Sequence, residues 1–255
     1  MFTKVERLIS SRNLRPKKKE GFLKIISIFS FLGIMLGVAI LIIVMSVMNG
    51  FKTDLTNKIL GLNPHIVIQS NGFVIEDNYL LKIKKKFKDI SISKTYSGEG
   101  IILKNDKAKG IVFKGVNYKE KKIREFFENN IVKGDVKKLK KKNIFVGSEL
   151  AFNLNLEEGD KINLMSSAFV ATPLGSLPKQ ENFTISGIFN TGFIEFDQNI
   201  IFLSIEDSLS IFDKDTKDLN LEIYIKNPLE ANKYKKEIEK LNQNHFIYTW
   251  SDLNK

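Results

Sequence analysis

The stretch IISIFSFLGIMLGVAILIIVMSVMNGF, residues 25–51, contains 27 residues and no charged side chain. As a helix rising about 1.5 Å per residue it would span roughly 40 Å, more than the ~30 Å hydrocarbon core of a bilayer. Fifteen of residues 25–48 are Leu, Ile, Phe or Val, and their insertion gains at most roughly 5–9 kcal/mol, enough to carry the serines in the stretch. The sequence therefore predicts a transmembrane helix, which we place at residues 23–50.

A cleaved signal peptide is the competing interpretation of this stretch. Its apolar region would be about 7–15 residues long and would end in small residues of the A-x-A kind. The run here is longer, and residues 45–50, MSVMNG, offer no such site. Residues 1–24 carry eight basic side chains and a net charge of +6, which keeps that end in the cytoplasm. We therefore expect residues 51–255 to lie outside the membrane on the opposite side.

Two smaller features surround the apolar run. Residues 1–22 place Phe2, Val5 and Leu8 at helical spacing among cations, which is typical of a basic amphipathic helix at the cytoplasmic membrane surface. A disordered basic leader explains the same residues equally well. Gly33 and Gly37 form a small-xxx-small pair, which favours close approach of another helix.

Composition excludes several kinds of chemistry. The chain has no cysteine, and His65 and His245 are its two histidines, so disulfides, thiol catalysis and cysteine-ligated metals are excluded. Of the net charge of +11, only +5 falls outside residues 1–24, which argues against a general nucleic-acid-binding surface. No phosphate-binding loop or catalytic triad is present in the sequence pattern. Acidic clusters at 157–160 and 213–218 are more typical of solvated loops than of divalent-cation sites. We expect no catalytic residues, metal or cofactor.

Residues 52–255 alternate short strands and helices, which predicts a mixed α/β fold of the α+β class with a β-rich portion. We expect strands at 64–69, 95–103, 110–116, 144–146, 161–166, 183–189, 200–203, 219–225 and 246–250. We expect helices at 78–88, 119–128, 147–154, from 204 onward, and 229–241.

Residues 169–180, FVATPLGSLPKQ, interrupt two of those strands. Pro173 and Pro178 remove ladder donors, so we expect a projecting loop rather than paired strands. Apolar Phe169, Leu174 and Leu177 on such a loop suit a docking surface. A loop folded back over its own core is an equally good explanation of these residues.

Several blocks together resemble a known family. VMSVMNGF at 44–51 is followed by ILGLNPHI at 59–66, and later by ATPLG at 171–175, FTISGIF at 183–189 and TWSDLN at 249–254. In this order they are similar to the lipoprotein-releasing ABC transporter permeases of the LolC/LolE type, and the resemblance covers essentially the whole chain.

This resemblance implies an inner-membrane permease that pairs with a second permease, like or unlike, and with separate ABC ATPase subunits. Such a permease extracts lipoproteins from membrane lipid and passes them to a periplasmic carrier of the LolA type. The fold implied is a macrolide-exporter-like periplasmic core over residues 51–255. Within it, a porter-like α/β subdomain (51–118 and 204–255) would be split around a β-rich insertion (119–203).

The resemblance also assigns site residues. Residues 169–180 match the carrier-binding hook, in which we expect Phe169, Thr172, Pro173, Leu174, Gly175, Leu177 and Pro178 to make the contacts. The first membrane helix lines the lipid cavity in that family, which assigns Leu41, Met45, Met48 and Asn49 to the cavity, with Gly33 and Gly37 as helix-packing positions. Methionine suits variable acyl chains because its side chain is flexible and polarizable.

One departure from the family pattern concerns length. Family members continue with three further membrane helices, including the one that engages the ATPase, whereas this chain stops at Lys255. We expect a fragment, a split gene or a degenerate copy, which by itself does not support transport. Two alternative functions remain open: a related permease for export or mechanical signalling, and a membrane-anchored periplasmic adaptor.

Overall fold

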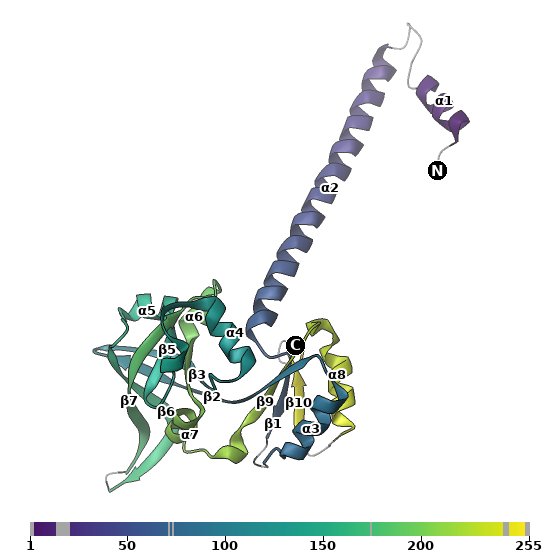
Figure 1. Cartoon of the computed structure of the whole chain (residues 1–255). Coiled ribbons are helices and arrows are strands. Elements are labelled where there is room, and N and C mark those ends of the chain that lie inside the picture. The colour runs from purple at the N-terminus through teal and green to yellow at the C-terminus, as the bar shows by residue number, and fades with distance from the viewer. Residues whose placement is uncertain are drawn as a thin grey trace. The chain divides into compact units, whose positions relative to one another are not determined.

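The computed structural model describes residues 3–13, 21–70, 72, 74–173, 175–241 and 245–252. The chain divides into two compact units, residues 1–57 and 58–255. The helices are α1 (Lys4–Asn13), α2 (Gly21–Leu62), α3 (Asp77–Lys86), α4 (Lys121–Asn130), α5 (Ser148–Leu154), α6 (Ile194–Asn199), α7 (Ile205–Ile211) and α8 (Ala231–Glu239), with short 3-10 turns η1 (Val136–Lys138), η2 (Thr216–Asp218) and η3 (Pro228–Glu230) (Figure 1). The strands are β1 (Ile66–Gln69), β2 (Ile90–Lys104), β3 (Lys107–Val116), β4 (Ile131–Gly134), β5 (Asn143–Gly147), β6 (Lys161–Thr172), β7 (Gly175–Phe189), β8 (Ile200–Ser204), β9 (Asn220–Ile225) and β10 (Phe246–Thr249).

The predicted apolar helix is present as part of α2. Residues 25–54 of this helix are long and apolar enough to cross a membrane, and none of the most apolar window is buried. The helix continues beyond the predicted end at residue 50 and finishes at Leu62. Pro64 explains that end, because the residue before a proline is disfavoured in helical geometry.

A helix also forms at the N-terminus, over Lys4–Asn13, with Val5, Leu8 and Ile9 exposed. Phe2, the first residue of the expected apolar stripe, lies outside the described residues. Placement of this helix at a membrane surface stays a prediction.

The second unit is built on a ten-stranded sheet with the order β10-β1-β9-β2-β3-β8-β5-β7-β4. The last strand, β6, pairs with both β2 and β7, so β2, β3, β8, β5, β7 and β6 form a closed ring. Strand β2 belongs to two sections of the sheet: Ile90–Thr95 pairs with β9, and Tyr96–Lys104 pairs with β3. We call β10, β1, β9 and the start of β2 the first section, and the closed ring the second section.

Each section buries its own apolar cluster. In the first section α3 and α8 lie beside β1 and β10 (Figure 1) and join Ile83 and Ile238 to Ile66, Ile68 and Ile223. Inside the ring, Ile102, Phe113, Ile144, Ile185 and Leu203 form a second cluster. A third cluster under α4 is rich in phenylalanine: Phe127, Phe145, Phe189, Phe196 and Phe202.

The strands and helices expected after residue 64 form, and most of their ends shift by three residues or fewer. Three ends differ more: β2 begins five residues before its predicted start, β6 ends six residues after its predicted end, and β7 begins eight residues before its predicted start. Strand β4 and helix α6 were not expected, because segments of four and six residues are too short to show a clear period. The predicted subdomain boundaries stay a prediction. Strand β3, which precedes residues 119–203, pairs in the ring with β8, of which all but Ser204 lies within those residues. The partner of β2 changes at Thr95 because a fifteen-residue strand is long enough to serve both sections.

Close packing at Gly187 gives a first testable prediction. A Cβ atom at this position in β7 would lie 2.8 Å from Cζ of Phe145, a fully buried ring. We expect Gly187→Ala to destabilise the fold by about 1–3 kcal/mol, since the packed ring has no space to move into. Thermal unfolding followed by circular dichroism measures this, with Gly110→Ala, where the added Cβ meets nothing within 4 Å, as the control. Equal melting temperatures for the two variants would contradict the prediction.

Candidate functional site

Residues 169–180 belong to an antiparallel hairpin formed by the ends of β6 and β7. The pairs are Phe169 with Pro178, Val170 with Leu177, Ala171 with Ser176 and Thr172 with Gly175. The expectation of a projecting loop without strand pairing was therefore wrong. Pro173 lies in the turn, where no ladder donor is needed, and Pro178 lies where β7 has β6 as its one neighbour among the described residues, so its missing N–H can face solvent.

A bulge separates this distal hairpin, residues 169–173 and 175–178, from the rest of β6 and β7. The register shifts between Met165 and Phe169, so three residues of β6 face one residue of β7. Ser166, at 3% exposure, holds the bulge: its hydroxyl donates to the carbonyl of Ile211 (2.6 Å) and accepts the N–H of Ala168 (3.2 Å). A bulge bends and twists the strand that carries it, so these bonds set the direction of the distal hairpin.

The distal hairpin exposes apolar side chains on both faces. Phe169, Val170 and Leu177 are 64%, 46% and 57% exposed. Paired residues in an antiparallel ladder share a face and neighbours along a strand alternate. Phe169 and Pro178 therefore lie on one face, and Val170 and Leu177 lie on the other.

The tip of the hairpin is closed by a local hydrogen bond. The hydroxyl of Thr172 donates to the carbonyl of Gly175 at 2.6 Å. Gly175 has φ of +122°, a conformation that side-chain-bearing residues rarely adopt. Thus Thr172, Pro173 and Gly175 serve the turn itself. Leu174, also expected to contact a carrier, lies outside the described residues.

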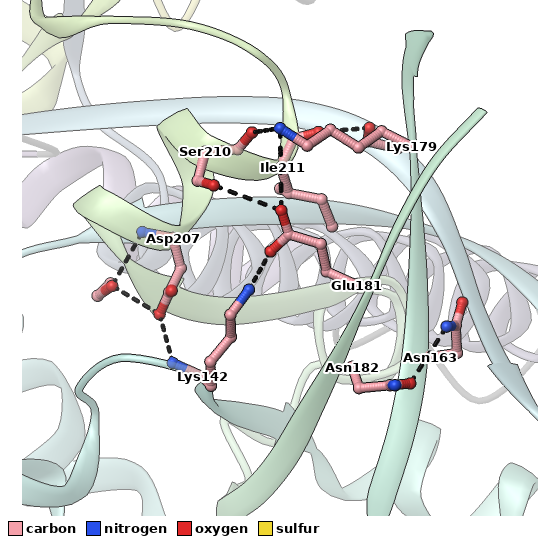
Figure 2. Close-up of polar contacts among 10 residues, drawn as sticks. Lys142, Asn163, Lys179, Glu181, Asn182, Asp207, Ser210 and Ile211 are labelled. Carbon is pink, nitrogen blue, oxygen red and sulfur yellow. Dashed lines mark hydrogen bonds and ion pairs between the residues drawn. The ribbon is translucent and has the colours of Figure 1, made fainter. Parts of the chain in front are cut away.

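Polar contacts tie the base of the hairpin to neighbouring elements, as Figure 2 shows. Lys179 donates through Nζ to the carbonyl of Ser210 in α7 at 2.5 Å. Glu181, also in β7, accepts a hydrogen bond from the Ser210 hydroxyl at 3.3 Å and forms an ion pair with Lys142. The backbone N–H of Lys142 in turn donates to buried Asp207 at 2.8 Å. The base is therefore held on α7 and on the residue before β5. This restraint reduces the conformational entropy that the hairpin would lose when a partner binds.

Sequence patterns alone did not reveal the residues of this base. Lys142 is the last residue of a lysine cluster at 137–142, a pattern that is typical of a solvated face. The alternation of apolar and polar residues stops after Leu164, and the predicted strand ends at residue 166. This loss of alternation was the one sequence signal for a change in the strand near the base of the hairpin.

The acidic clusters serve local structure. Asp160 pairs with Lys104 and accepts the N–H of Glu157 at 2.9 Å; the hydrogen bond from Lys104 lowers the pKa of Asp160. Asp215 caps η2 by accepting the N–H of Lys217 at 2.8 Å, which lowers the pKa of Asp215. Among the described residues no group of three or more His, Cys, Asp or Glu side chains could hold a metal ion.

A cavity of about 820 Å³ lies between the β3–α4 turn, residues 139–142 and α7, lined in part by Lys119, Lys140 and Lys141. Its buried carboxylate, Asp207, is hydrogen-bonded to the Ser204 hydroxyl at 2.8 Å. Ser204 is the N-cap residue of α7 and its hydroxyl also accepts the backbone N–H of Asp207 at 3.1 Å, so this contact stabilises the start of the helix.

The residues expected to line a lipid cavity all lie on α2. Gly33, Gly37, Leu41 and Met45 follow one another at i,i+4 spacing and therefore share one face of the helix. Met48 and Asn49 continue that face toward the end of the apolar stretch. A Cβ atom at Gly33 or Gly37 would meet nothing within 4 Å, so close approach of another helix is sterically open. Lipid binding by these residues stays a prediction.

Comparison with known proteins gives a family and several relatives. The family model of the MacB-like periplasmic core domain matches residues 27–241. The lipoprotein-releasing system transmembrane protein LolC of Xylella fastidiosa (strain Temecula1) is 28% identical over 84% of this chain and 53% of its own length. The protein of the same description from Buchnera aphidicola subsp. Acyrthosiphon pisum is 31% identical over 98% of this chain and 63% of its own length.

A solved structure, the periplasmic region of MacB from Actinobacillus actinomycetemcomitans, is 11% identical with a TM-score of 0.46, covering 76% of this chain and 92% of that one. The chain spans about half the length of the Xylella relative. Residues 27–241, which the family model matches, include most of α2 and nearly all of the second unit. On that evidence the chain belongs to the family of the MacB-like periplasmic core domain, and in sequence it is similar to LolC.

Proposed function

We propose that this chain acts as a permease subunit of an ABC transporter that extracts lipoproteins from the inner membrane and passes them to a soluble periplasmic carrier of the LolA type. The distal hairpin is the docking site for the carrier. The observation that carries this proposal is the exposure of Phe169, Val170 and Leu177 on a hairpin whose base is fixed by Ser166 and Glu181. Exposed apolar side chains on a preorganised support are what a partner of matching apolar surface recognises.

The remaining parts of the proposal concern the membrane. Helix α2 crosses the bilayer with the cationic N-terminal segment in the cytoplasm and the second unit in the periplasm, following the distribution of Lys and Arg. ATP hydrolysis belongs to a separate ATPase subunit, and a second permease, like or unlike this one, lies beside the face of α2 that carries Gly33 and Gly37. The names of the relatives support release of lipoproteins as the activity.

A second candidate follows from the family model, which is named for MacB and not for LolC. Under this alternative the chain is a related permease for export or mechanical signalling, and the distal hairpin has no carrier to bind. A membrane-anchored adaptor that works without ATP predicts carrier binding but no dependence on an ATPase.

A binding experiment with the full chain in detergent separates these functions. Residues 169–178 are replaced by an Asn-Gly turn, which closes a two-residue hairpin, and a LolA-type carrier is used in a pull-down. We expect the replacement to abolish binding while leaving the melting temperature within a few degrees, since Phe169, Val170 and Leu177 are largely exposed and contribute little to the core. Undiminished binding by the variant, or no binding by the unaltered chain, would overturn the docking assignment. Stimulation of a partner ATPase by loaded lipoprotein then distinguishes a transporter from an adaptor.

A further inference from the structure

The last turn of α2 is joined to the sheet through the side chain of His65. This residue follows Pro64, is 6% exposed, and lies immediately before β1. The backbone N–H of Ile225 in β9 donates to Nδ1 of His65 at 2.9 Å, and Nε2 lies 2.9 Å from the carbonyl oxygen of buried Leu60 in α2. An N–H can only donate, so Nδ1 must accept, and Nε2 must carry the proton that is donated to Leu60. The two contacts therefore define a neutral imidazole in a single tautomer.

The backbone of His65 is held as firmly as its ring. Its N–H donates to the carbonyl of Ile223 in β9 at 3.1 Å, and its carbonyl accepts the N–H of Trp250, just after β10, at 3.1 Å. One residue thus contacts the end of α2, strand β9 and the segment that follows β10. The ring is the part of His65 that reaches the helix.

The groups around the ring favour the neutral form. Tyr224 of β9 lies edge-on at 5.8 Å between centroids, and its hydroxyl donates to Glu222 at 2.7 Å. Glu222 is paired with Lys114 of β3, and Lys122 of α4 lies 5.3 Å from the centre of the Tyr224 ring. Burial lowers the pKa of His65, and the nearby charge of Lys122 lowers it further, against the hydrogen bonds to Leu60 and Ile225, which raise it. A second proton, on Nδ1, would face the N–H of Ile225 and break that contact.

We infer that His65 is a positioning residue that fixes the last turn of the membrane helix on β9, so that a tilt of the helix end is passed to the periplasmic core through the neutral imidazole. This inference rests on the proposed function only in taking α2 as a membrane helix. It adds a residue outside the distal hairpin and outside the apolar face of α2.

Two conservative variants separate the two bonds of the ring. The carbonyl oxygen of Asn lies near the position of Nδ1, so His65→Asn keeps an acceptor for Ile225 and loses the bond to Leu60. The longer Gln places its amide near Nε2, so His65→Gln keeps the bond to Leu60. Both variants lose the packing of the ring on Tyr224, and their difference therefore reports the link to the helix.

Spin-label distances in the full chain measure that link. The chain has no cysteine, so Lys52→Cys in α2 and Lys226→Cys after β9, both exposed, take labels specifically in lipid nanodiscs. At pH 7.5 we expect a distance distribution at least twice as wide in His65→Asn as in the unaltered chain, and nearly unchanged in His65→Gln, with circular dichroism confirming that both are folded.

Equal widths for His65→Asn and the unaltered chain would overturn the inference. So would equal broadening in His65→Asn and His65→Gln, because the lost packing of the ring on Tyr224, which the two variants share, would then explain it. The measurement requires no carrier, lipoprotein or ATPase, so its failure is distinguishable from failure of the docking assignment.

Discussion

Phe169→Asp is expected to weaken binding of a LolA-type carrier by about 30-fold or more, which corresponds to about 2 kcal/mol for a buried aromatic anchor. The ring is 64% exposed in the free chain and shares its face of the hairpin with Pro178. Docking would bury this ring, and a carboxylate in the same position must lose its hydration without gaining a partner. Titration of the labelled carrier into the full chain in detergent measures the dissociation constant.

Phe152→Asp is the matched control for this variant. Phe152 lies in α5, away from the hairpin pairing, and is 79% exposed. It receives the same chemical change on the same kind of side chain, and we expect its affinity for the carrier to stay within twofold. Equal losses in the two variants would point to a nonspecific effect of charge. Normal binding by Phe169→Asp would remove the ring from the docking surface.

Lys114→Met is expected to destabilise the second unit by about 3–5 kcal/mol, the usual cost of removing one partner of a buried ion pair. Lys114 and Glu222 are 8% and 5% exposed, with 3.0 Å between Nζ and Oε1. The loss of Lys114 leaves Glu222 with the hydroxyl of Tyr224 as its hydrogen-bond partner among the described residues. For a unit of about 200 residues this corresponds to a fall in melting temperature of about 6–20 °C.

A second variant distinguishes loss of the charge pair from loss of the lysine packing. Lys114→Met combined with Glu222→Gln removes both charges while the amide oxygen still accepts the Tyr224 hydroxyl, so we expect most of the stability to return. Lys86→Met breaks an exposed pair with Glu237 and should cost less than about 1 kcal/mol. If the double variant were no more stable than Lys114→Met, packing rather than charge would explain the destabilisation.

The Lys114–Glu222 ion pair also connects two parts of the fold that no local sequence pattern predicts to be connected. Lys114 comes from the ring of strands and Glu222 from the first section, so their ion pair joins the two sections of the sheet beside the point where β2 changes partner. A lysine within a strand of mostly apolar residues predicts at most an outward-facing position. Its burial depends on a carboxylate more than one hundred residues later in the chain.

The sequence by itself determined the features that depend on neighbouring residues. The membrane helix follows from 27 consecutive uncharged residues, because hydrophobic transfer adds along a helix without reference to the rest of the chain. The alternation of strands and helices follows from periods of 2 and 3.6, and the helix beginning after Ser204 follows from its capping hydroxyl. The apolar residues of the hairpin were equally evident.

The tertiary structure decided the features that join distant residues. The hydrogen bond between His65 and Ile225 spans 160 positions, and the one between Ser166 and Ile211 spans 45. Through them the structure fixes the end of α2 and turns an expected loop into a bent, anchored hairpin. A side chain's own sequence neighbours set its local conformation, whereas the partner that satisfies a buried polar group is known only once the chain has closed around it.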